Sequence, residues 1–251
     1  MTVLITGAAG GVATALLPGL ADLDLRLTDR APGTGFVVGD LCTPGFARAV
    51  CDGVDAVVHL AADPDPAHGW ERLRGPNADA VVAMLEACAA VGVPRLVLAS
   101  SLHAVGGYRD QGDEPIPDGI TPFPCCTYGA TKAFAEALGH AYAQQWDMRV
   151  VCLRLGGVAA APPARSWLPG WLSHGDLIRL VRAALTADVN FGVFSGTSAN
   201  TPTVFGLDAT RATLGYAPVD DAAAYAATVP DDTPPAPDPA ARPRWGLLHR
   251  S

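Results

Sequence analysis

A tyrosine and a lysine with helical spacing are the residues of this sequence best suited to proton transfer. Tyr128 and Lys132 are four positions apart, so a helix would place both side chains on one face, one turn apart. A free tyrosine has a pKa of about 10 and is a poor base at neutral pH. A neighbouring ammonium group stabilises the phenolate and lowers that pKa. The pair therefore predicts that Tyr128 accepts a proton from a substrate hydroxyl group.

A serine pair at a strand end is predicted to supply a third polar group. Ser100 and Ser101 directly follow the apolar run Leu96–Ala99. Ser101 stands past the predicted end of this strand, where its side chain is free to point inward. We therefore expect Ser101 to orient the hydroxyl group that Tyr128 deprotonates.

A glycine-rich turn near the N-terminus predicts the binding of a dinucleotide. The apolar run Val3–Thr6 leads into Gly7-Ala-Ala-Gly-Gly-Val-Ala13. A glycine allows the sharp turn that follows the strand, and the start of the next helix offers free N–H groups to a pyrophosphate. We expect the cofactor to contact the residues of this turn, Gly7, Gly10, Gly11 and Val12.

An acidic residue at the end of the second predicted strand indicates NAD as the cofactor. Asp29 lies about twenty residues beyond the glycine-rich turn, where a carboxylate accepts hydrogen bonds from the ribose hydroxyls and repels a 2′-phosphate. Arg30 works against this preference, because its guanidinium tolerates the phosphate. Further residues expected along the cofactor follow the third and fourth strands and are Asp40, Leu41, Leu60, Ala61 and Ala62.

Alternating patterns predict the framework that positions these residues. Short apolar runs rich in Val or Leu are predicted strands, at Val3–Thr6, Leu25–Thr28, Phe36–Val38, Ala56–Leu60, Leu96–Ala99 and Val150–Leu153. Predicted helices cover Ala13–Leu20, Pro76–Val91 and Tyr128–Trp146. Repeated β-α-β order predicts an α/β fold, a Rossmann-type doubly wound parallel sheet with ligands at the carboxyl ends of its strands.

The helix predicted at Tyr128–Trp146 carries an apolar stripe that we expect to face the sheet. Its members are Ala130, Ala133, Phe134, Ala137, Leu138 and Ala141. The other side, with Ala135, His140, Tyr142 and Ala143, is expected to lie outward and is compatible with either solvent or a homo-oligomer contact.

The pattern changes after Leu155, and a small C-terminal subdomain is expected there. Gly156–Gly170 has the composition of a loop, and Ser173 is placed to cap a following helix. A strand near Val189–Val193 and a helix at Ala209–Leu214 come next, before a proline-rich tail from Val229 onward. We therefore divide the chain into an NAD-binding domain with the catalytic residues (1–157) and a substrate-binding subdomain with the tail (158–251).

Composition narrows the class of protein. Of 251 residues, 49% are hydrophobic and 17% charged, and the net charge is -8. These values allow a large core, and no cluster of Lys or Arg with aromatic residues indicates nucleic-acid binding. No apolar run approaches the ~18 residues of a membrane span, and a strand rather than a signal peptide occupies the first residues. We expect a soluble, cytoplasmic protein with a small-molecule partner.

The cysteines are expected to be reduced and without a catalytic role. The sequence has six, and their spacing gives no metal-binding motif. We therefore predict no metal site. The neighbours Cys125 and Cys126 stand out, because they directly precede the segment with Tyr128.

Taken together and in order, these residues resemble the extended short-chain dehydrogenase/reductase family, to which NAD-dependent epimerases and dehydratases belong. The matches cover roughly residues 1–157 and are Thr6-Gly7-x-x-Gly10, Asp29, Asp40-Leu41, His59-Leu-Ala-Ala62, Asn77, Ser100-Ser101, Tyr128, Lys132 and Arg154. Within the family the chain looks most like bacterial uronate dehydrogenases, on the stretches 99–106, 171–176 and 196–200.

The resemblance implies an activity and a set of roles. The activity is oxidation of the anomeric carbon of a hexuronate by NAD, which gives an aldarolactone. Ser101, Tyr128 and Lys132 would be the catalytic residues, and Tyr128 and Lys132 would also contact the cofactor. Asn77 would support the active-site backbone beside the cofactor. His103 and Arg165 would contact the substrate, and Arg165 is able to hold a carboxylate through two parallel hydrogen bonds.

Three positions depart from the uronate dehydrogenase pattern. Leu102 stands where those enzymes have an asparagine, and Gly157 and Pro64 stand where they have serines. We expect Leu102 and Gly157 to border the substrate with Ser101, His103 and Tyr128, and to favour a less polar or differently decorated ligand.

Two other functions fit part of the pattern. One is an epimerase or dehydratase that keeps NAD tightly bound, and the other is a redox sensor that binds NAD without turnover. The short C-terminal region argues against a nucleotide-sugar substrate. The presence of Ser101, Tyr128 and Lys132 argues against a sensor.

Overall fold

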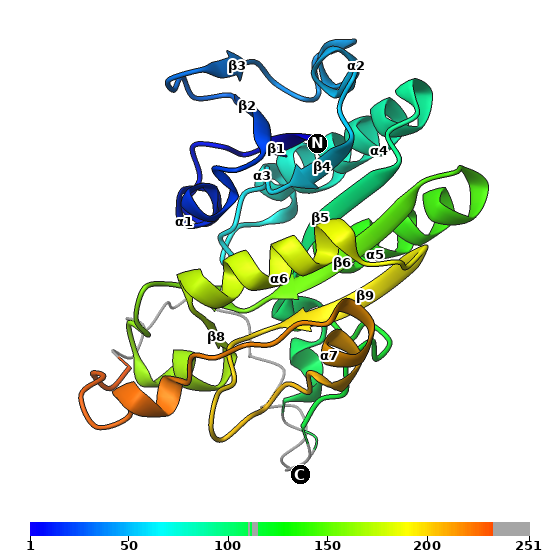
Figure 1. Cartoon of the computed structure of the whole chain (residues 1–251). Coiled ribbons are helices and arrows are strands. Elements are labelled where there is room, and N and C mark those ends of the chain that lie inside the picture. The colour runs from blue at the N-terminus through cyan, green and yellow to red at the C-terminus, as the bar shows by residue number, and fades with distance from the viewer. Residues whose placement is uncertain (110, 112–114, 233–251) are drawn as a thin grey trace.

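A parallel sheet forms the centre of the computed structural model, which describes residues 1–109, 111 and 115–232 (Figure 1). The described residues contribute seven strands to it, in the order β3-β2-β1-β4-β5-β6-β9. Their bounds are β1 Thr2–Thr6, β2 Asp24–Asp29, β3 Phe36–Val38, β4 Ala56–His59, β5 Arg95–Ser101, β6 Arg149–Leu155 and β9 Phe191–Gly196. The strand order reverses between β1 and β4, and ligands bind at such a reversal in open α/β sheets. The Rossmann-type fold predicted from the sequence is confirmed.

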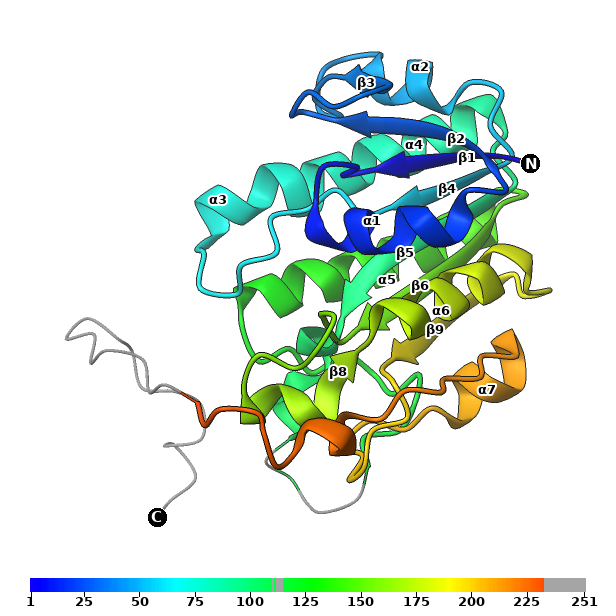
Figure 2. The same cartoon turned by 60° about the vertical axis from the view of Figure 1, so that its left-hand side comes forward.

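Helices cover both faces of the sheet (Figures 1 and 2). One face is covered by α1 and α6, and the other by α2, α4 and α5. A hydrophobic core lies on each face of the sheet, and successive strand residues point into opposite cores. Val3 and Ile5 of β1 pack with α1 and α6, and Leu4 packs with α2 and α4. The helices are α1 Gly11–Leu16, α2 Phe46–Cys51, α3 Trp70–Arg74, α4 Ala80–Val91, α5 Thr127–Gln145, α6 His174–Thr186 and α7 Asp208–Leu214.

Short helical turns complete or join several of these elements. The turn η1 (Leu17–Leu20) extends α1, and a π-helical turn, η2 (Gly75–Asp79), joins α3 to α4. The turns η3 (Leu102–Ala104) and η4 (Gly106–Tyr108) follow β5. The sequence pattern did not predict α2, α3 or the π-helical character of η2.

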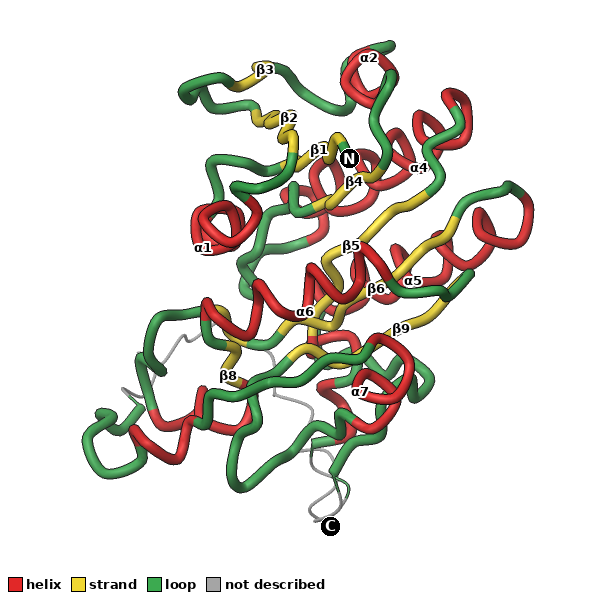
Figure 3. Tube along the Cα trace, viewed as in Figure 1, coloured by secondary structure: helices red, strands yellow, loops and turns green. Residues whose placement is uncertain are grey.

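The residues after 157 divide between the sheet and a smaller lobe. The strand β9 pairs with β6, and α6 covers the sheet, so both belong to the central unit. As predicted, the Ser173 hydroxyl caps α6 by accepting the N–H of Asp176 at 2.9 Å. The lobe contains the parallel pair β7 (Gly157–Val158) and β8 (Trp171–Leu172) and the turns η5 (Arg165–Gly170) and η6 (Ala222–Tyr225). The helix α7 packs on the central unit, where its Leu214 joins the core beside α6 and β9. Figure 3 shows that much of the chain around β8 is loop.

The orientation of α5 differs from the prediction. Its buried residues include Tyr128, Lys132, Glu136 and Ala135, whereas Phe134 of the expected inward stripe is 42% exposed. Ala143, expected to face outward, is also buried. The helix turns its polar face inward because polar groups are paired there, as Glu136 is with Ser100 and Arg154.

No helix among the described residues is both long enough and apolar enough to cross a membrane. Of the proline-rich tail, residues 233–251 lie outside the described residues.

Candidate active site

The glycine-rich turn has the geometry that its sequence predicts. Gly7 has a φ of +69°, and a Cβ there would lie 2.7 Å from the amide nitrogen of Ala61. Both a left-handed backbone and close contact with the loop after β4 therefore require glycine. The N–H of Gly10 donates to the carbonyl of Gly7 at 2.9 Å. A Cβ at Gly11 would meet no atom within 4 Å, so the start of α1 is open to a ligand.

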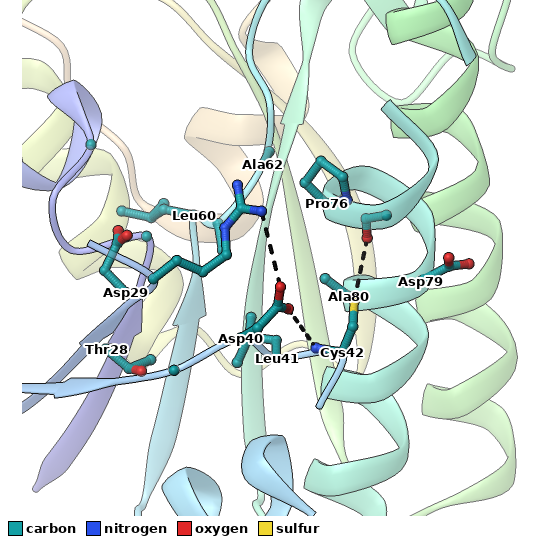
Figure 4. A pocket seen from close by; sticks show the side chains of 16 residues that line it. Thr28, Asp29, Asp40, Leu41, Cys42, Leu60, Ala62, Pro76, Asp79 and Ala80 are labelled. Atoms are coloured by element: carbon teal, nitrogen blue, oxygen red, sulfur yellow. Dashed lines mark hydrogen bonds and ion pairs between the residues drawn. The ribbon is translucent and has the colours of Figure 1, made fainter. Parts of the chain in front are cut away.

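A pocket of about 310 Å³ opens at the carboxyl ends of β1, β2 and β4 (Figure 4). Eight of the residues predicted to bind the cofactor line it, namely Gly7, Gly10, Asp29, Asp40, Leu41, Leu60, Ala61 and Ala62. Arg30, which the sequence singled out for its charge, also lines it. The sequence did not single out the rest of the lining, Thr28, Gly39, Cys42, Gly75, Pro76, Asp79 and Ala80. Gly11, Val12, Asn77, Tyr128 and Lys132 are outside this lining.

Carboxylates organise the rim of the pocket where β2 and β3 end. Asp29 accepts the N–H of Ala9 at 3.0 Å and that of Ala31 at 2.9 Å, so it ties the glycine-rich turn to the end of β2. The guanidinium of Arg30 lies 4.0 Å from a carboxylate oxygen of Asp40. Asp40 thus offsets the positive charge of Arg30, the basic residue of the pocket lining, which would favour a 2′-phosphate.

Ser101, Tyr128 and Lys132 are brought together where β5 ends and α5 begins. All three side chains are buried. The Ser101 hydroxyl is hydrogen-bonded to the Tyr128 phenol. Nζ of Lys132 donates to the carbonyl of Ala99 at 2.8 Å and lies 5.6 Å from the centre of the Tyr128 ring. The structure therefore places the predicted base, its orienting serine and the lysine in one cluster.

The direction of the Tyr128 pKa differs from the expectation. Burial raises it above its usual value, and the hydrogen bond from Ser101 opposes this rise. The Lys132 ammonium group donates to a backbone carbonyl rather than to the phenol, which limits its effect on the phenolate. Burial also lowers the pKa of Lys132, to about 8.

Asn77 connects the pocket to the catalytic helix. Its Oδ1 accepts the N–H of Asp63 at 2.7 Å, and its Nδ2 donates to the Asp63 carbonyl at 3.0 Å. The same Nδ2 lies 3.3 Å from the hydroxyl of Thr131, which in turn donates to the Tyr128 carbonyl at 2.7 Å. Asn77 therefore holds the loop after β4 against the turn of α5 that carries Tyr128.

Glu136 is a site residue that the sequence reasoning missed. It lies one turn beyond Lys132, and its carboxylate accepts two hydrogen bonds of 2.8 Å from Arg154 of β6. The Ser100 hydroxyl donates to the same carboxylate. This buried network fixes the catalytic face of α5 on β5 and β6. The spacing Tyr128, Lys132, Glu136 was the signal that could have identified it.

His59 is a second residue to which the sequence reasoning gave no role. It ends β4, and its Nδ1 is 2.8 Å from the Thr6 hydroxyl. That hydroxyl also accepts the N–H groups of Leu60 and Ala61, both at 3.2 Å. Burial, aided by the charge of Lys132, lowers the pKa of His59 to about 3, so the ring is neutral. A neutral His59 thus links the two strand ends between which the pocket opens.

His103 and two cysteines surround the start of α5. The His103 ring stands edge-on to Tyr128, with ring centres 5.6 Å apart. Its Nδ1 is 3.3 Å from Sγ of Cys125 and 3.4 Å from Sγ of Cys126. Cys126 Sγ also accepts the N–H of Gly129 at 3.4 Å and so caps α5. The hydrogen bond from the Cys125 thiol, with help from His103 and Gly129, lowers the pKa of Cys126 to about 4.

Leu102 and Gly157 depart from the uronate dehydrogenase pattern, and both pack against apolar side chains. Leu102 is buried in a small apolar cluster with Val105, Ile116 and Phe205. A Cβ at Gly157 would lie 2.3 Å from the ring of Trp167 in η5, so the indole fills the space that a serine would use. Pro64, the third such position, adjoins the Asp63 backbone that Asn77 holds.

Arg165 is separated in sequence from the catalytic cluster and lies in η5. Its guanidinium is 52% exposed and pairs with Asp231 at 2.7 Å. The same turn ends at Gly170, where a Cβ would be 3.2 Å from the Leu102 side chain. The turn that carries Arg165 therefore borders the segment that follows Ser101.

Comparison with known proteins places the chain among sugar-oxidising enzymes. NAD-dependent glucose-6-phosphate dehydrogenase of Haloferax volcanii is 35% identical, over 89% of this chain and 95% of its own length. Uronate dehydrogenase of Pseudomonas putida is 33% identical, over 94% and 90%. A mutant uronate dehydrogenase from Agrobacterium tumefaciens, solved with NAD, has a TM-score of 0.85 at 30% identity and covers 95% of this chain and 92% of its own.

The family is shown by a match that spans most of the chain. Residues 3–168 match the model described as NAD dependent epimerase/dehydratase family. This range holds the glycine-rich turn, the pocket and the cluster of Ser101, Tyr128 and Lys132. The chain belongs to the NAD dependent epimerase/dehydratase family.

Proposed function

We propose that the chain is an NAD-dependent dehydrogenase that oxidises the anomeric hydroxyl group of a sugar acid. The observation that carries the proposal is the buried cluster of Ser101, Tyr128 and Lys132, next to a pocket of about 310 Å³ at the glycine-rich turn. The glucose-6-phosphate dehydrogenase and the two uronate dehydrogenases to which the chain is similar support it, since all three are named as dehydrogenases of sugar derivatives.

The pocket residues fit NAD. The open start of α1 suits a diphosphate, and the Asp29 carboxylate at the end of β2 suits ribose hydroxyls. We assign the diphosphate to Gly7, Gly10, Gly11 and Val12. Asp40, Leu41 and Leu60–Ala62 would line the remaining length of the cofactor, and Asn77, Tyr128 and Lys132 its reactive end. NAD, when bound, supplies the acceptor for the hydride that leaves the substrate carbon.

Ser101, Tyr128 and Lys132 have different roles in the proposed proton transfer. Ser101 donates a hydrogen bond that orients the substrate hydroxyl group, and Tyr128 accepts the proton of that hydroxyl. Lys132, with a pKa of about 8, is mostly charged at neutral pH and adds a positive charge near the phenol. Because burial raises the pKa of Tyr128, the phenol is mostly protonated at neutral pH. The phenolate fraction, and with it the rate of oxidation, therefore increases as the pH is raised.

The substrate side is proposed to lie between the segment after β5 and the smaller lobe. We assign the substrate carboxylate to Arg165, and contacts to the sugar to His103, Leu102 and Gly157. Uronate dehydrogenases have polar residues at positions 102 and 157. Leu102 and the Trp167 ring over Gly157 make this side more apolar. Residues 158–251 would thus form the substrate-binding part, although α6 and β9 also complete the sheet.

One assay tests the proposed activity. Purified protein is incubated with NAD and with uronic acids, sugar phosphates or neutral aldoses, and NADH absorbance is followed. We expect stoichiometric NADH, fastest with a uronic acid. Product without net NADH would indicate an epimerase, and NAD binding without any product would indicate a sensor; either result contradicts the proposal.

A pair of tyrosine variants tests the proton acceptor. Tyr128→Phe is expected to lower kcat by about 100-fold or more. Tyr142→Phe, at the far end of the same helix, is expected to keep wild-type kcat and controls for loss of a phenol on α5. Equal activity of Tyr128→Phe and wild type would show that another group takes the proton.

The cofactor assignment has its own test. Asp29→Ala is expected to weaken the preference for NAD over NADP, because the carboxylate that repels a 2′-phosphate is gone. The ratio of kcat/KM for the two cofactors measures this preference. An unchanged ratio would mean that Asp29 does not face the ribose.

A homo-oligomer through α5 is also proposed. Part of the stripe expected to face the sheet is instead turned outward, and this part includes Phe134, which is 42% exposed. A second copy of the chain would cover this surface. Phe134→Glu is expected to reduce the mass measured by light scattering to that of a monomer, and a monomeric wild type would refute the contact.

A further inference from the structure

Three soft ligand atoms converge at the start of α5. Nδ1 of His103, Sγ of Cys125 and Sγ of Cys126 all lie within 4.8 Å of one another. His103 precedes Cys125 by 22 positions, which is why spacing along the sequence gave no sign of this group. The fold brings them together because the backbone N–H of Cys125 donates to the carbonyl of His103 at 3.2 Å. Within the described ranges, this is the cluster of three or more His, Cys, Asp or Glu residues suited to a metal ion.

We propose that His103, Cys125 and Cys126 form a binding site for a soft divalent cation such as Zn²⁺. In a tetrahedral zinc site, bond lengths of about 2.3 Å to sulfur and 2.0–2.1 Å to nitrogen put two sulfurs about 3.8 Å apart and a sulfur and a nitrogen about 3.5 Å apart. Here the sulfurs are 3.9 Å apart, and the nitrogen is 3.3 and 3.4 Å from them. The ligand atoms already have the spacing that a tetrahedral cation requires.

The chemistry of the three groups selects the kind of cation. Imidazole nitrogen with two thiolates suits Zn²⁺ and disfavours Mg²⁺ and Ca²⁺, which prefer oxygen ligands. Binding would release the Cys125 thiol proton to solvent, and the two thiolates would balance the charge of the cation. Cys125 is exposed and the other two ligands are half-buried, so an ion has access from solvent.

The position of the site gives the cation a structural consequence. His103 lies in η3, directly after the end of β5 at Ser101, whereas Cys126 caps the helix that carries Tyr128. A bound cation would join these two segments directly beside the Tyr128 ring. Three protein ligands also leave a fourth coordination position for water or another small ligand.

Cobalt titration of the full-length protein tests the site. After removal of metal with a chelator, we expect Co²⁺ to bind at one ion per chain with a thiolate-to-cobalt charge-transfer band, and Zn²⁺ to displace it. Cys125→Ser, Cys126→Ser and His103→Ala are each expected to weaken binding by at least about tenfold, since each removes a ligand. Cys42→Ser removes an exposed thiol elsewhere and is expected to leave the stoichiometry and the band unchanged.

A stability measurement keeps the test independent of folding defects and of enzymatic activity. Serine is a good helix cap, so Cys126→Ser is expected to fold, which circular dichroism verifies. Zn²⁺ should raise the Tm of the wild type and of Cys42→Ser but not that of Cys126→Ser. Absence of the charge-transfer band in the wild type, or its persistence in the Cys125→Ser/Cys126→Ser double variant, would overturn the proposal. Neither result bears on the proposed dehydrogenase.

Discussion

Nε of Arg165 donates a 2.7 Å hydrogen bond to Oδ1 of Asp231, a residue 66 positions later in the chain. A second nitrogen of the guanidinium donates to the Ala226 carbonyl at 3.3 Å. The group that we assign to a substrate carboxylate is thus already paired with a carboxylate of the C-terminal segment. A substrate that uses Arg165 must displace Asp231.

Removing that competitor is expected to improve the binding of an acidic substrate. Asp231→Asn should lower KM for a uronic acid by up to about fivefold, the range that an exposed ion pair allows, and leave kcat unchanged. Initial rates over a range of substrate concentrations measure this. KM for a neutral aldose serves as the control and should not change. A higher KM for the uronic acid would show that Asp231 positions Arg165 rather than competes for it.

Two glycines of the nucleotide-binding turn should respond differently to alanine. Gly7→Ala is expected to cost at least about 1 kcal/mol of unfolding free energy, because φ is positive and its Cβ would collide with Ala61. Gly11→Ala should retain wild-type stability, since its Cβ meets open space, but should weaken NAD binding there. Urea unfolding and calorimetric titration with NAD separate the two effects. Wild-type NAD affinity in Gly11→Ala would remove Gly11 from the site.

The buried pair of Glu136 and Arg154 should be costly to break. Both side chains are at most 3% exposed, and removing one charge leaves its partner unpaired in the core. Glu136→Gln is expected to lower the free energy of unfolding by about 3 kcal/mol. Asp188→Asn, which breaks an exposed pair with Arg149, is the matched control and should leave the urea midpoint nearly unchanged. Equal effects of the two variants would refute the anchoring role of Glu136.

The lowered pKa of Lys132 predicts a pH dependence of stability. Burial lowers this pKa to about 8 from 10.5, so between these values the unfolded chain binds more protons than the folded chain. The free energy of unfolding should therefore rise with pH across this window, by about 3 kcal/mol in total. The same rise should be missing in Lys132→Met. Urea unfolding of both proteins at pH 7, 8.5 and 10 compares the slopes.

The titration of Lys132 is also directly observable. It is the only lysine in the sequence, so protein labelled with ¹³C-lysine should give one side-chain NMR signal. We expect this signal to titrate near pH 8. A midpoint near 10.5 would show that the ammonium group is solvated and would contradict the stability prediction as well.

Much of the fold could be predicted because strand and helix patterns are local. The run Val3–Thr6 and the cap at Ser173 depend on neighbours in the sequence, and both occur as predicted. The facing of α5 was predicted wrongly, because hydrophobicity alone assigned its apolar stripe to the core. The contacts of Glu136 turn the polar face of α5 toward the sheet, and its partners Ser100 and Arg154 come from two different strands. No local pattern contains that information.

The candidate site divides in the same way. Gly7 and Asp29 were predictable, since a turn and a strand end have fixed spacing in the sequence, and both line the pocket. The Arg165–Asp231 pair and the cluster of His103 with Cys125 were not, because each joins segments that only tertiary folding brings together. The contribution of burial to the pKa of Tyr128 was not predictable for a related reason, because burial depends on the whole surroundings of the phenol.

The π-helical turn η2 makes chain length, and not only residue type, a constraint on this protein. A π turn holds one residue more than an α turn, and each helical residue advances the direction of a side chain by about 100°. Deleting a single residue between α3 and α4 would restore a regular helix, yet it would rotate Asn77 away from Asp63 and Thr131. A substitution scan would miss this dependence, whereas a one-residue deletion at Pro76 would reveal it.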